Sequence, residues 1–340
     1  MADEHYGEQT SRGRRDIPAF VLGLGFFLAF FAGLVLVFRG DPVMDSSRFA
    51  AVEGGARAGI GVVEINGVIQ FAAPSGFMPA MAGAARYVEE IRTLQENPNV
   101  RGLVLRINSQ GGSVAATQEV YNAVKRFRQT GRPVIASMGD IAASGGYYVA
   151  CAGDEIFANP GTITGSIGVI MRAPNLSGLY EWANIQWNVI KSGQYKDIFS
   201  SMRPMTAAEQ RILVNLVRNA YEQFFAAVLE NRTIKQSELE QLAQGQIFSG
   251  NQAHENGLVD AEGDFEAALA RAAELAGIRG RPHIIRTRRE PGLGDLLRLL
   301  SSGGVTSMLH ELIMPAAKPL SEGVVIGYLY QGVGNVSPVF

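Results

Sequence analysis

The residues of this chain that could do chemistry gather around one serine. Ser144 lies in the stretch ASMGDIAASGGYYVACAGD, where alanines and glycines precede an apolar run of helical character. Upstream, the loop NSQGGS carries the adjacent glycines Gly111 and Gly112 between a predicted strand and a predicted helix. Glycine lets the backbone approach a ligand closely, and backbone amides beside a serine hydroxyl suit the oxyanion hole of an acyl-transfer enzyme. Ser144 is therefore a candidate nucleophile, and a serine that only caps its helix is the alternative.

A nucleophilic serine needs a proton acceptor, and the sequence offers few candidates. None of the four histidines lies near Ser144 in sequence, and His254, in SGNQAHENGLVD, has the surroundings of a solvated helix residue. Lys191 and Lys196 share the loop VIKSGQYKDIF. A lysine acts as a base only where burial or a nearby cation lowers its pKa, and serine–lysine pairs are a known variant of the catalytic triad. The residues alone do not separate the two lysines, and an ion pair of Lys196 with Asp197 or a nearby acid is the structural alternative.

Strands that alternate with helices must position these residues. The β-branched run GIGVVEINGVI (59–69) predicts a strand, and a helix over about 113–128 follows the glycine loop. The next predicted strand leads into a helix that Ser144 opens. Such βαβ units predict an α/β fold. In that fold Ser144 and Gly145 lie at the same sheet edge as the glycine pair of the NSQGGS loop.

Further along the chain, the pattern predicts a short strand at EIFAN (155–159), one more strand and several helices. The apolar segment NIQWNVI (184–190) predicts a strand before the loop with the two lysines. Residues 206–232 predict a long helix, with Thr206 and Glu209 in the spacing of a capping box. Residues 245–277 predict two further helices that close the domain.

The composition limits both the class of protein and the kind of site. The chain has 340 residues, a formal net charge of −2 and 47% hydrophobic residues, which indicates a globular protein and gives no reason to expect a nucleic-acid partner. Its one cysteine, Cys151, excludes an intramolecular disulfide. The histidines and the cysteine have no zinc-ligand spacing, so we expect no metal and no other cofactor.

The N-terminal region predicts a membrane anchor. Residues 17–38 are uncharged and apolar, and a helix of this length rises about 33 Å, enough to cross the ~30 Å hydrocarbon core of a bilayer. A cleavable signal peptide is the competing interpretation, but the apolar run is too long for one and no small-residue cleavage site follows it. Arginines crowd the N-terminal side of the run, which favours a cytoplasmic segment at 1–16 and a main domain outside the cytoplasm.

Three regions follow the predicted anchor. They are a polar linker at 39–57, a globular domain at 58–278 and a C-terminal tail at 279–340. The tail begins with a basic, strand-like piece and continues as short amphipathic segments. We expect it to dock on its own domain or on a neighbouring subunit, and contact with a membrane surface is the alternative.

Four motifs, in this order along the chain, resemble one family. LVLRINSQGGSV, GDIAASGGYYVACAGDEIFANPGTITGSIGVI, IKSGQYKDIFS and FSGNQAHENGLVD resemble the short-form bacterial signal peptide peptidases, the SppA-type membrane serine proteases. The likeness extends from about Ile60 to Ala276. It implies a ClpP/crotonase-like α/β core of repeated ββα units, preceded by one N-terminal transmembrane helix.

The resemblance also implies a Ser/Lys dyad. The serine of AASGGYY, the family's nucleophile, is Ser144 here, and the second lysine of KSGQYKD, the family's general base, is Lys196. In related enzymes the serine of the TGSIGV motif orients that lysine, and Ser166 matches it. By this resemblance, Lys196 takes the proton of Ser144.

The oxyanion hole follows from the same resemblance. The family's amide donor points to Gly111 with Gly112, and the amide of Gly145 is a second donor. The chain departs from the family's common SPGG at Gln110, where it has SQGG. Glutamine leaves the backbone angle φ less restricted than proline, which affects the rigidity of the loop and not its chemistry.

Assembly and substrate are implied by the resemblance alone. Short-form members are homo-octamers whose active sites are completed by residues from adjacent subunits. The implied task is the degradation of hydrophobic signal peptides that remain in the membrane after preprotein processing. The implied location is the bacterial inner membrane, with a single-pass anchor in contact with lipid and the catalytic domain on the extracytoplasmic side. A crotonase-type acyl-CoA enzyme and an inactive scaffold of the same fold are the alternatives.

Overall fold

The computed structural model describes residues 51–53, 57–71, 83–288 and 327–329. The predicted anchor and the N-terminal segment lie outside these residues, as do most of the predicted linker and most of the tail. Within the described ranges, no helix combines the length and the apolar character that a membrane span requires.

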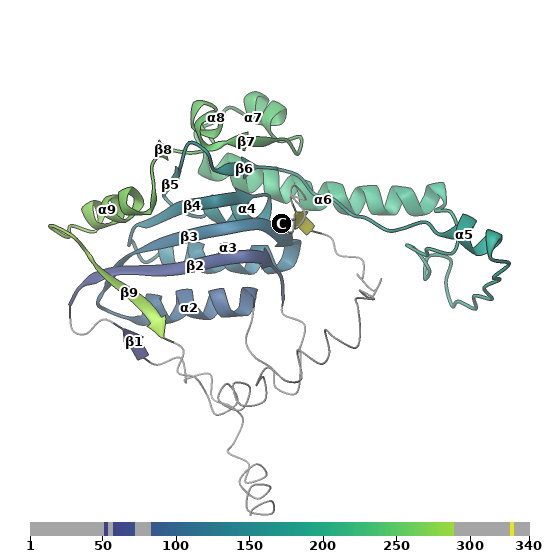
Figure 1. Cartoon of the computed structure of the whole chain (residues 1–340), viewed down its shortest axis with the longest axis horizontal. Coiled ribbons are helices and arrows are strands. Elements are labelled where there is room, and N and C mark those ends of the chain that lie inside the picture. Colours follow the sequence, from purple (N-terminus) through teal and green to yellow (C-terminus); the bar gives the residue numbers. More distant parts are fainter. Residues whose placement is uncertain (1–50, 54–56, 72–82, 289–326, 330–340) are drawn as a thin grey trace, which may run out of the picture. The chain divides into compact units, whose positions relative to one another are not determined.

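A mostly parallel sheet forms the centre of the fold (Figure 1). Its central strands, each parallel to the next, are β2 (Gly59–Ile69), β3 (Val100–Ser113), β4 (Val134–Ala143) and β5 (Glu155–Ala158). The sheet continues with β8 (Ala261–Glu262) beside β5, β9 (His283–Arg288) beside β2, and β1 (Ala51–Glu53), which is antiparallel to β9. Near the end of β4, the strand β6 (Ile163–Gly165) runs parallel to it and β7 (Ile247–Ser249) antiparallel to β6. The predicted α/β class and the predicted strand at 59–69 are confirmed.

The chain also forms helices, most of which pack around the sheet (Figure 1). They are α2 (Ala84–Glu96), α3 (Val114–Arg128), α4 (Gly145–Ala150), α5 (Ser177–Trp182), α6 (Ala207–Asn231), α7 (Gln236–Leu242), α8 (Gly250–Glu255) and α9 (Phe265–Leu275). The helices α2, α3 and α4 share one hydrophobic core with the sheet, and α9 shares a second one.

The strand β2 explains why both faces of the sheet are covered. Ile60 and Val62 pack in the core that contains α9, whereas Val63 and Ile65 belong to the core that contains α2 and α3. Successive side chains of a strand point to opposite faces, so a continuous apolar run needs helices on both sides. Each large apolar side chain buried in this way stabilises the fold by about 1.5–3 kcal/mol.

The long helix α6 begins at the predicted capping box. The backbone N–H of Glu209 donates to the Thr206 hydroxyl at 3.2 Å, and the Thr206 N–H donates to the Glu209 carboxylate at 2.8 Å. Further along α6, Phe224 contacts Tyr148 of α4, with ring centroids 5.0 Å apart. From this contact α6 extends away from the sheet toward α5 (Figure 1).

The prediction of a strand at 184–190 is wrong. This segment, which follows α5, has no regular secondary structure, and Ile190 is fully exposed. The alternation of apolar and polar residues there is typical of a strand, but a strand also needs a neighbour for its backbone hydrogen bonds. Among the described residues, none pairs with this segment.

Candidate active site

Ser144 lies at a strained turn between β4 and α4. Its backbone angles are φ 53° and ψ −117°, a combination that non-glycine residues rarely adopt. The Ser144 N–H donates to the carbonyl of Gly165 at 2.8 Å, and the Ser144 carbonyl accepts the N–H of Tyr148 at 2.9 Å. Strain of this kind persists where the surrounding structure fixes it and occurs preferentially at active sites.

The hydroxyl of Ser144 makes no hydrogen bond to the part of the chain that the structure describes. The residue stands at the N-cap position of α4, but its side chain makes no capping hydrogen bond. The residue is 1% exposed, and its Oγ has no hydrogen-bond partner in the part of the chain that the structure describes. The capping interpretation is therefore wrong. A buried hydroxyl without a partner costs about 1–3 kcal/mol, which makes a functional role the better explanation.

The glycine loop meets the start of α4, as the sequence predicts. A Cβ atom added to Gly145 would lie 3.1 Å from the amide nitrogen of Gly112 and 3.2 Å from Cα of Gly111. A Cβ atom on Gly146 would lie 2.6 Å from the carbonyl oxygen of Ser109. Only glycine permits this close approach, so the end of β3 and the first turn of α4 form one small site.

Ser109, which the sequence did not single out, holds the glycine loop. The N–H of Gly111 donates to the Ser109 hydroxyl at 3.1 Å. This bond fixes the turn of the loop around Gln110. Because the amide of Gly111 is engaged, Gly112 and Gly145 are the better candidates for donors to a substrate.

Ser166 lies next to the turn that carries Ser144. It follows β6 directly and also has a positive φ, of 50°. Its N–H donates to the carbonyl of Gln246 at 2.7 Å, while the preceding residue, Gly165, accepts the N–H of Ser144. The structure thus brings together Ser144, Ser166 and the glycines predicted for the oxyanion hole.

Within one chain, the structure does not bring Lys196 to this site. Lys196 is exposed in the loop between α5 and α6. That loop is tied to Glu209 in the first turn of α6, whereas α4 contacts α6 at Phe224. Fifteen helical residues separate these two points, which corresponds to about 22 Å. Figure 1 shows the same arrangement, with the loop at the far end of α6 from α4.

The two lysines of this loop differ in their contacts. Lys191 Nζ lies 2.6 Å from a carboxylate oxygen of Asp197. The ion pair with Asp197 that the sequence suggested for Lys196 is therefore formed by Lys191. Arg203 binds the same carboxylate and also that of Glu209. Hydrogen bonds from Arg203 hold the pKa of Asp197 well below its usual range and lower that of Glu209 to about 2. Among the described residues, Lys196 makes no ion pair.

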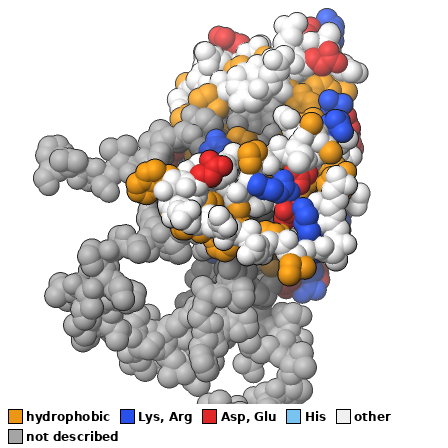
Figure 2. Space-filling view, turned by 90° about the vertical axis from the view of Figure 1, so that its right-hand side faces the viewer, with side chains coloured by type: hydrophobic (Ala, Val, Ile, Leu, Met, Phe, Trp, Pro, Cys, Tyr) orange, Lys and Arg blue, Asp and Glu red, His pale blue; other side chains and the backbone are white. Residues whose placement is uncertain are grey.

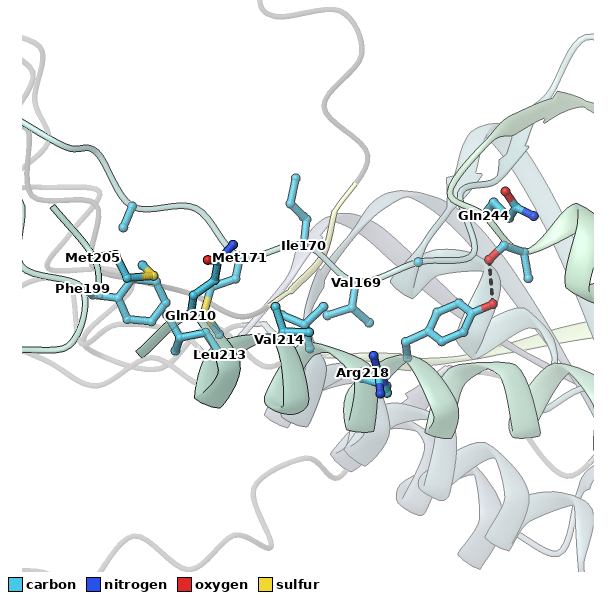
Figure 3. A pocket seen from close by; sticks show the side chains of 15 residues that line it. Val169, Ile170, Met171, Phe199, Met205, Gln210, Leu213, Val214, Arg218 and Gln244 are labelled. Atoms are coloured by element: carbon cyan, nitrogen blue, oxygen red, sulfur yellow. Dashed lines mark hydrogen bonds between the residues drawn. The ribbon is translucent and has the colours of Figure 1, made fainter. Parts of the chain in front are cut away.

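An apolar groove follows α6, and its lining begins at Gly168 (Figure 3). Its volume is about 740 Å³. Val169, Ile170 and Met171 line one wall, and Leu213 and Val214 of α6 line the other. Grooves of this size with apolar walls are typical of ligand-binding sites. The groove therefore offers an apolar surface two residues beyond Ser166.

A short strand lies on the glycine loop. It is β10 (Gly327–Leu329), which pairs antiparallel with β3, with Tyr328 opposite Gly112. It also lies near α4. The edge of the glycine loop therefore accepts an extended backbone beside Ser144, which is how many proteins bind peptides.

A buried, unpartnered serine at a strained strand-to-helix turn, beside a glycine loop that accepts an extended backbone, defines an α/β serine hydrolase. Comparison with known proteins narrows this class. Residues 126–279 match Peptidase family S49, and residues 80–162 match Clp protease. The chain belongs to peptidase family S49 and is a serine protease of the SppA type.

Three relatives illustrate this membership. "Putative protease slr0021" of Synechocystis is 40% identical over 247 residues, which cover 73% of this chain and 84% of the relative. "Protease 4" of Salmonella typhi is 32% identical over 254 residues, 75% of this chain and 40% of the relative. "Serine protease SPPA, chloroplastic" of Arabidopsis thaliana is 30% identical over 312 residues, 87% of this chain and 46% of the relative. The chain thus spans less than half the length of the last two.

Proposed function

We propose that this chain is a membrane-anchored endopeptidase that degrades hydrophobic signal peptides left in the membrane after preprotein processing. The observation that carries the proposal is the buried, unpartnered hydroxyl of Ser144 at its strained turn beside the glycine loop. The apolar groove and the backbone pairing at the loop edge support an apolar, extended peptide as substrate. The predicted anchor at 17–38 would keep the site at the outer surface of the inner membrane, near such peptides.

In the proposed reaction, Ser144 is the nucleophile and Lys196 the general base. Ser144 Oγ attacks the carbonyl carbon of the scissile peptide bond while its proton passes to the neutral Lys196 amine, which Ser166 orients. The carbonyl electron pair moves to the oxygen, whose negative charge the amides of Gly112 and Gly145 stabilise. The C–N bond then breaks and Lys196 returns the proton to the leaving amine. A water molecule, deprotonated by Lys196, hydrolyses the acyl-enzyme.

We infer that the dyad forms between neighbouring subunits of a homo-octamer. Lys196 is exposed and lies far from Ser144 of the same chain, so a second copy would have to supply one of the two residues. Covering Lys196 by a neighbour would also remove it from water, which favours the neutral amine that a base requires.

The surface around the lysine loop supports such an assembly. Hydrophobic side chains are exposed on the face that contains α5 (Figure 2). They include Leu179, Trp182, Ile185, Trp187, Val189 and Ile190. Exposed apolar surface of this extent marks a protein–protein contact more often than free surface. A second copy of the chain is the partner that would also complete the dyad.

The proposal is tested with subunits that lack one half of the dyad. Ser144→Ala and Lys196→Ala are each expected to abolish hydrolysis of a fluorogenic apolar peptide by the detergent-solubilised full chain. Co-expression of the two variants should restore about a quarter of the wild-type activity, because random mixing of a heterologous ring leaves that share of sites with both residues.

His254→Ala serves as the control and should retain full activity. A mixture that assembles normally but stays inactive would contradict a dyad formed between subunits. An inactive wild type of normal assembly would contradict the peptidase itself.

A further inference from the structure

A second buried hydroxyl near Ser144 has no partner. Thr117, in the second turn of α3, is 0% exposed, and its Oγ1 makes no hydrogen bond to any residue that the structure describes. A threonine inside a helix usually donates to a carbonyl one turn earlier. Thr117 does not, so its side chain contributes a buried donor that the fold leaves unused.

Other buried threonines of the same sheet edge are fully satisfied. The Thr162 hydroxyl donates to the carbonyl of Gly139 at 2.7 Å, and the Thr164 hydroxyl donates to that of Ala142 at 2.7 Å. The fold therefore can provide acceptors for buried hydroxyls in this region. The exceptions within the described residues are the hydroxyls of Thr117 and Ser144.

The Thr117 hydroxyl points at the residue that follows the nucleophile. A Cβ atom added to Gly145 would lie 2.8 Å from Thr117 Oγ1 and 3.1 Å from the amide nitrogen of Gly112. The hydroxyl and this amide thus flank the same point of the backbone. The absence of a side chain at Gly145 leaves the space between them open.

We propose that the Thr117 hydroxyl is a third donor of the oxyanion hole, beside the amides of Gly112 and Gly145. It would donate a hydrogen bond to the substrate oxygen that becomes negative when Ser144 attacks. The inference rests on the proposed peptidase reaction. A donor that is already buried, and has no acceptor to give up, stabilises developing charge without reorganisation. The position near the N-terminus of the 15-residue helix α3 favours negative charge at the same point.

The variant Thr117→Val removes the hydroxyl and keeps the shape of the side chain. We expect kcat to fall by about 10²–10³-fold with little change in KM, as for the loss of one oxyanion-hole donor. We expect the Tm to stay the same or to rise, because the hydroxyl removed had no partner in the folded chain. Thr117→Ser keeps the donor and should keep most of the activity.

Thr162→Val is the matched control. It removes a buried hydroxyl that does have a partner, so the Tm should fall while kcat stays close to the wild-type value. Opposite effects on stability and activity at the two threonines would distinguish a donor in the site from a residue that only packs.

Labelling of Ser144 by a fluorophosphonate gives a readout that does not depend on the peptide. The Oγ–P bond forms as the P–F bond breaks, the serine proton passes to the general base and fluoride leaves. The phosphoryl oxygen occupies the oxyanion hole, so Thr117→Val should be labelled more slowly than wild type. A wild type that is labelled but cleaves no peptide would contradict the proposed function alone, and the labelling rates would still decide the role of Thr117. Equal rates of labelling and hydrolysis in Thr117→Val and wild type would overturn the inference. So would a loss of activity in Thr117→Ser equal to that in Thr117→Val, or a wild type in which Ser144 is not labelled.

Discussion

One arginine determines where the loop with Lys196 is held. Arg203 donates to the carboxylates of both Asp197 and Glu209, and Glu209 also takes part in the capping box of α6. The residue after Lys196 is therefore fixed to the first turn of a long helix. The position of the proposed base thus depends on ionised carboxylates as well as on packing.

The pH dependence of stability should reveal this contact. Both carboxylates have a lowered pKa in the folded chain, so their contribution to stability is complete above the ordinary carboxyl pKa of about 4 and decreases progressively as the pH falls from there toward the folded-state pKa of each group. We expect Arg203→Met to lower the Tm at pH 7. The difference from wild type should shrink between pH 5 and pH ~2.5, because the two carboxylates become protonated in the unfolded chain while they stay ionised in the folded one.

Thermal unfolding of both proteins across this pH range tests the expectation. Arg211→Met, which changes an exposed arginine of α6, is the control and should leave the Tm nearly unchanged at every pH. A difference between Arg203→Met and wild type that stays constant down to pH ~2.5 would mean that Arg203 acts through packing alone.

At the scale of elements, β10 occupies the edge that the proposed substrate needs. It pairs antiparallel with the glycine loop of β3, so an extended peptide must displace it. A chain that ends at Ile326 lacks β10. We expect its KM for a short apolar peptide to fall about two- to tenfold at unchanged kcat, because the fraction of free sites rises.

Kinetics on three chains test this competition. A chain that ends at Gln331 keeps β10 and should behave like the full-length protein. If the chain that ends at Ile326 has the KM of the full-length protein, β10 and the peptide do not compete for the edge of β3.

Local signals account for the elements that the sequence predicts well. The β-branched run gives β2, which pairs with β3 and β9, and the capping box at Thr206 gives the start of α6 through contacts between neighbours in sequence. The segment 184–190 has an equally regular pattern, but strand formation depends on a partner that the described residues do not provide. The type of an element can therefore be predicted from its local pattern only where the rest of the described chain supplies the contacts that the element needs.

The candidate site is predictable in part for the same reason. The sequence places Ser144 and the glycine loop at one sheet edge, which follows from the order of strands and helices. It cannot distinguish a nucleophile from a helix cap, since that depends on whether the hydroxyl finds a partner. The proposed role of Thr117 depends on a contact between α3 and α4 and has no signal in the sequence.

At the scale of the whole molecule, one chain presents half of the proposed dyad on the sheet and the other half on an exposed loop. The apolar side chains near that loop are among the most exposed of the described residues, with Trp182 at 85% and Ile190 at 100%. Both features have one explanation if neighbouring copies cover this surface. Activity should then depend on assembly even when every site residue is intact.

The variant Ile190→Asp tests this dependence. A charge in a buried contact between subunits is costly, so we expect the detergent-solubilised full chain to elute from size exclusion as smaller species. Without a neighbour to supply the base, peptide hydrolysis should fall by about 10²-fold or more, although Ser144 and Lys196 are unchanged. Leu275→Asp, at an exposed apolar residue of α9, is the matched control and should retain assembly and activity. If Ile190→Asp loses assembly but hydrolyses peptides at the wild-type rate, each chain carries a complete site and the dyad does not cross between subunits.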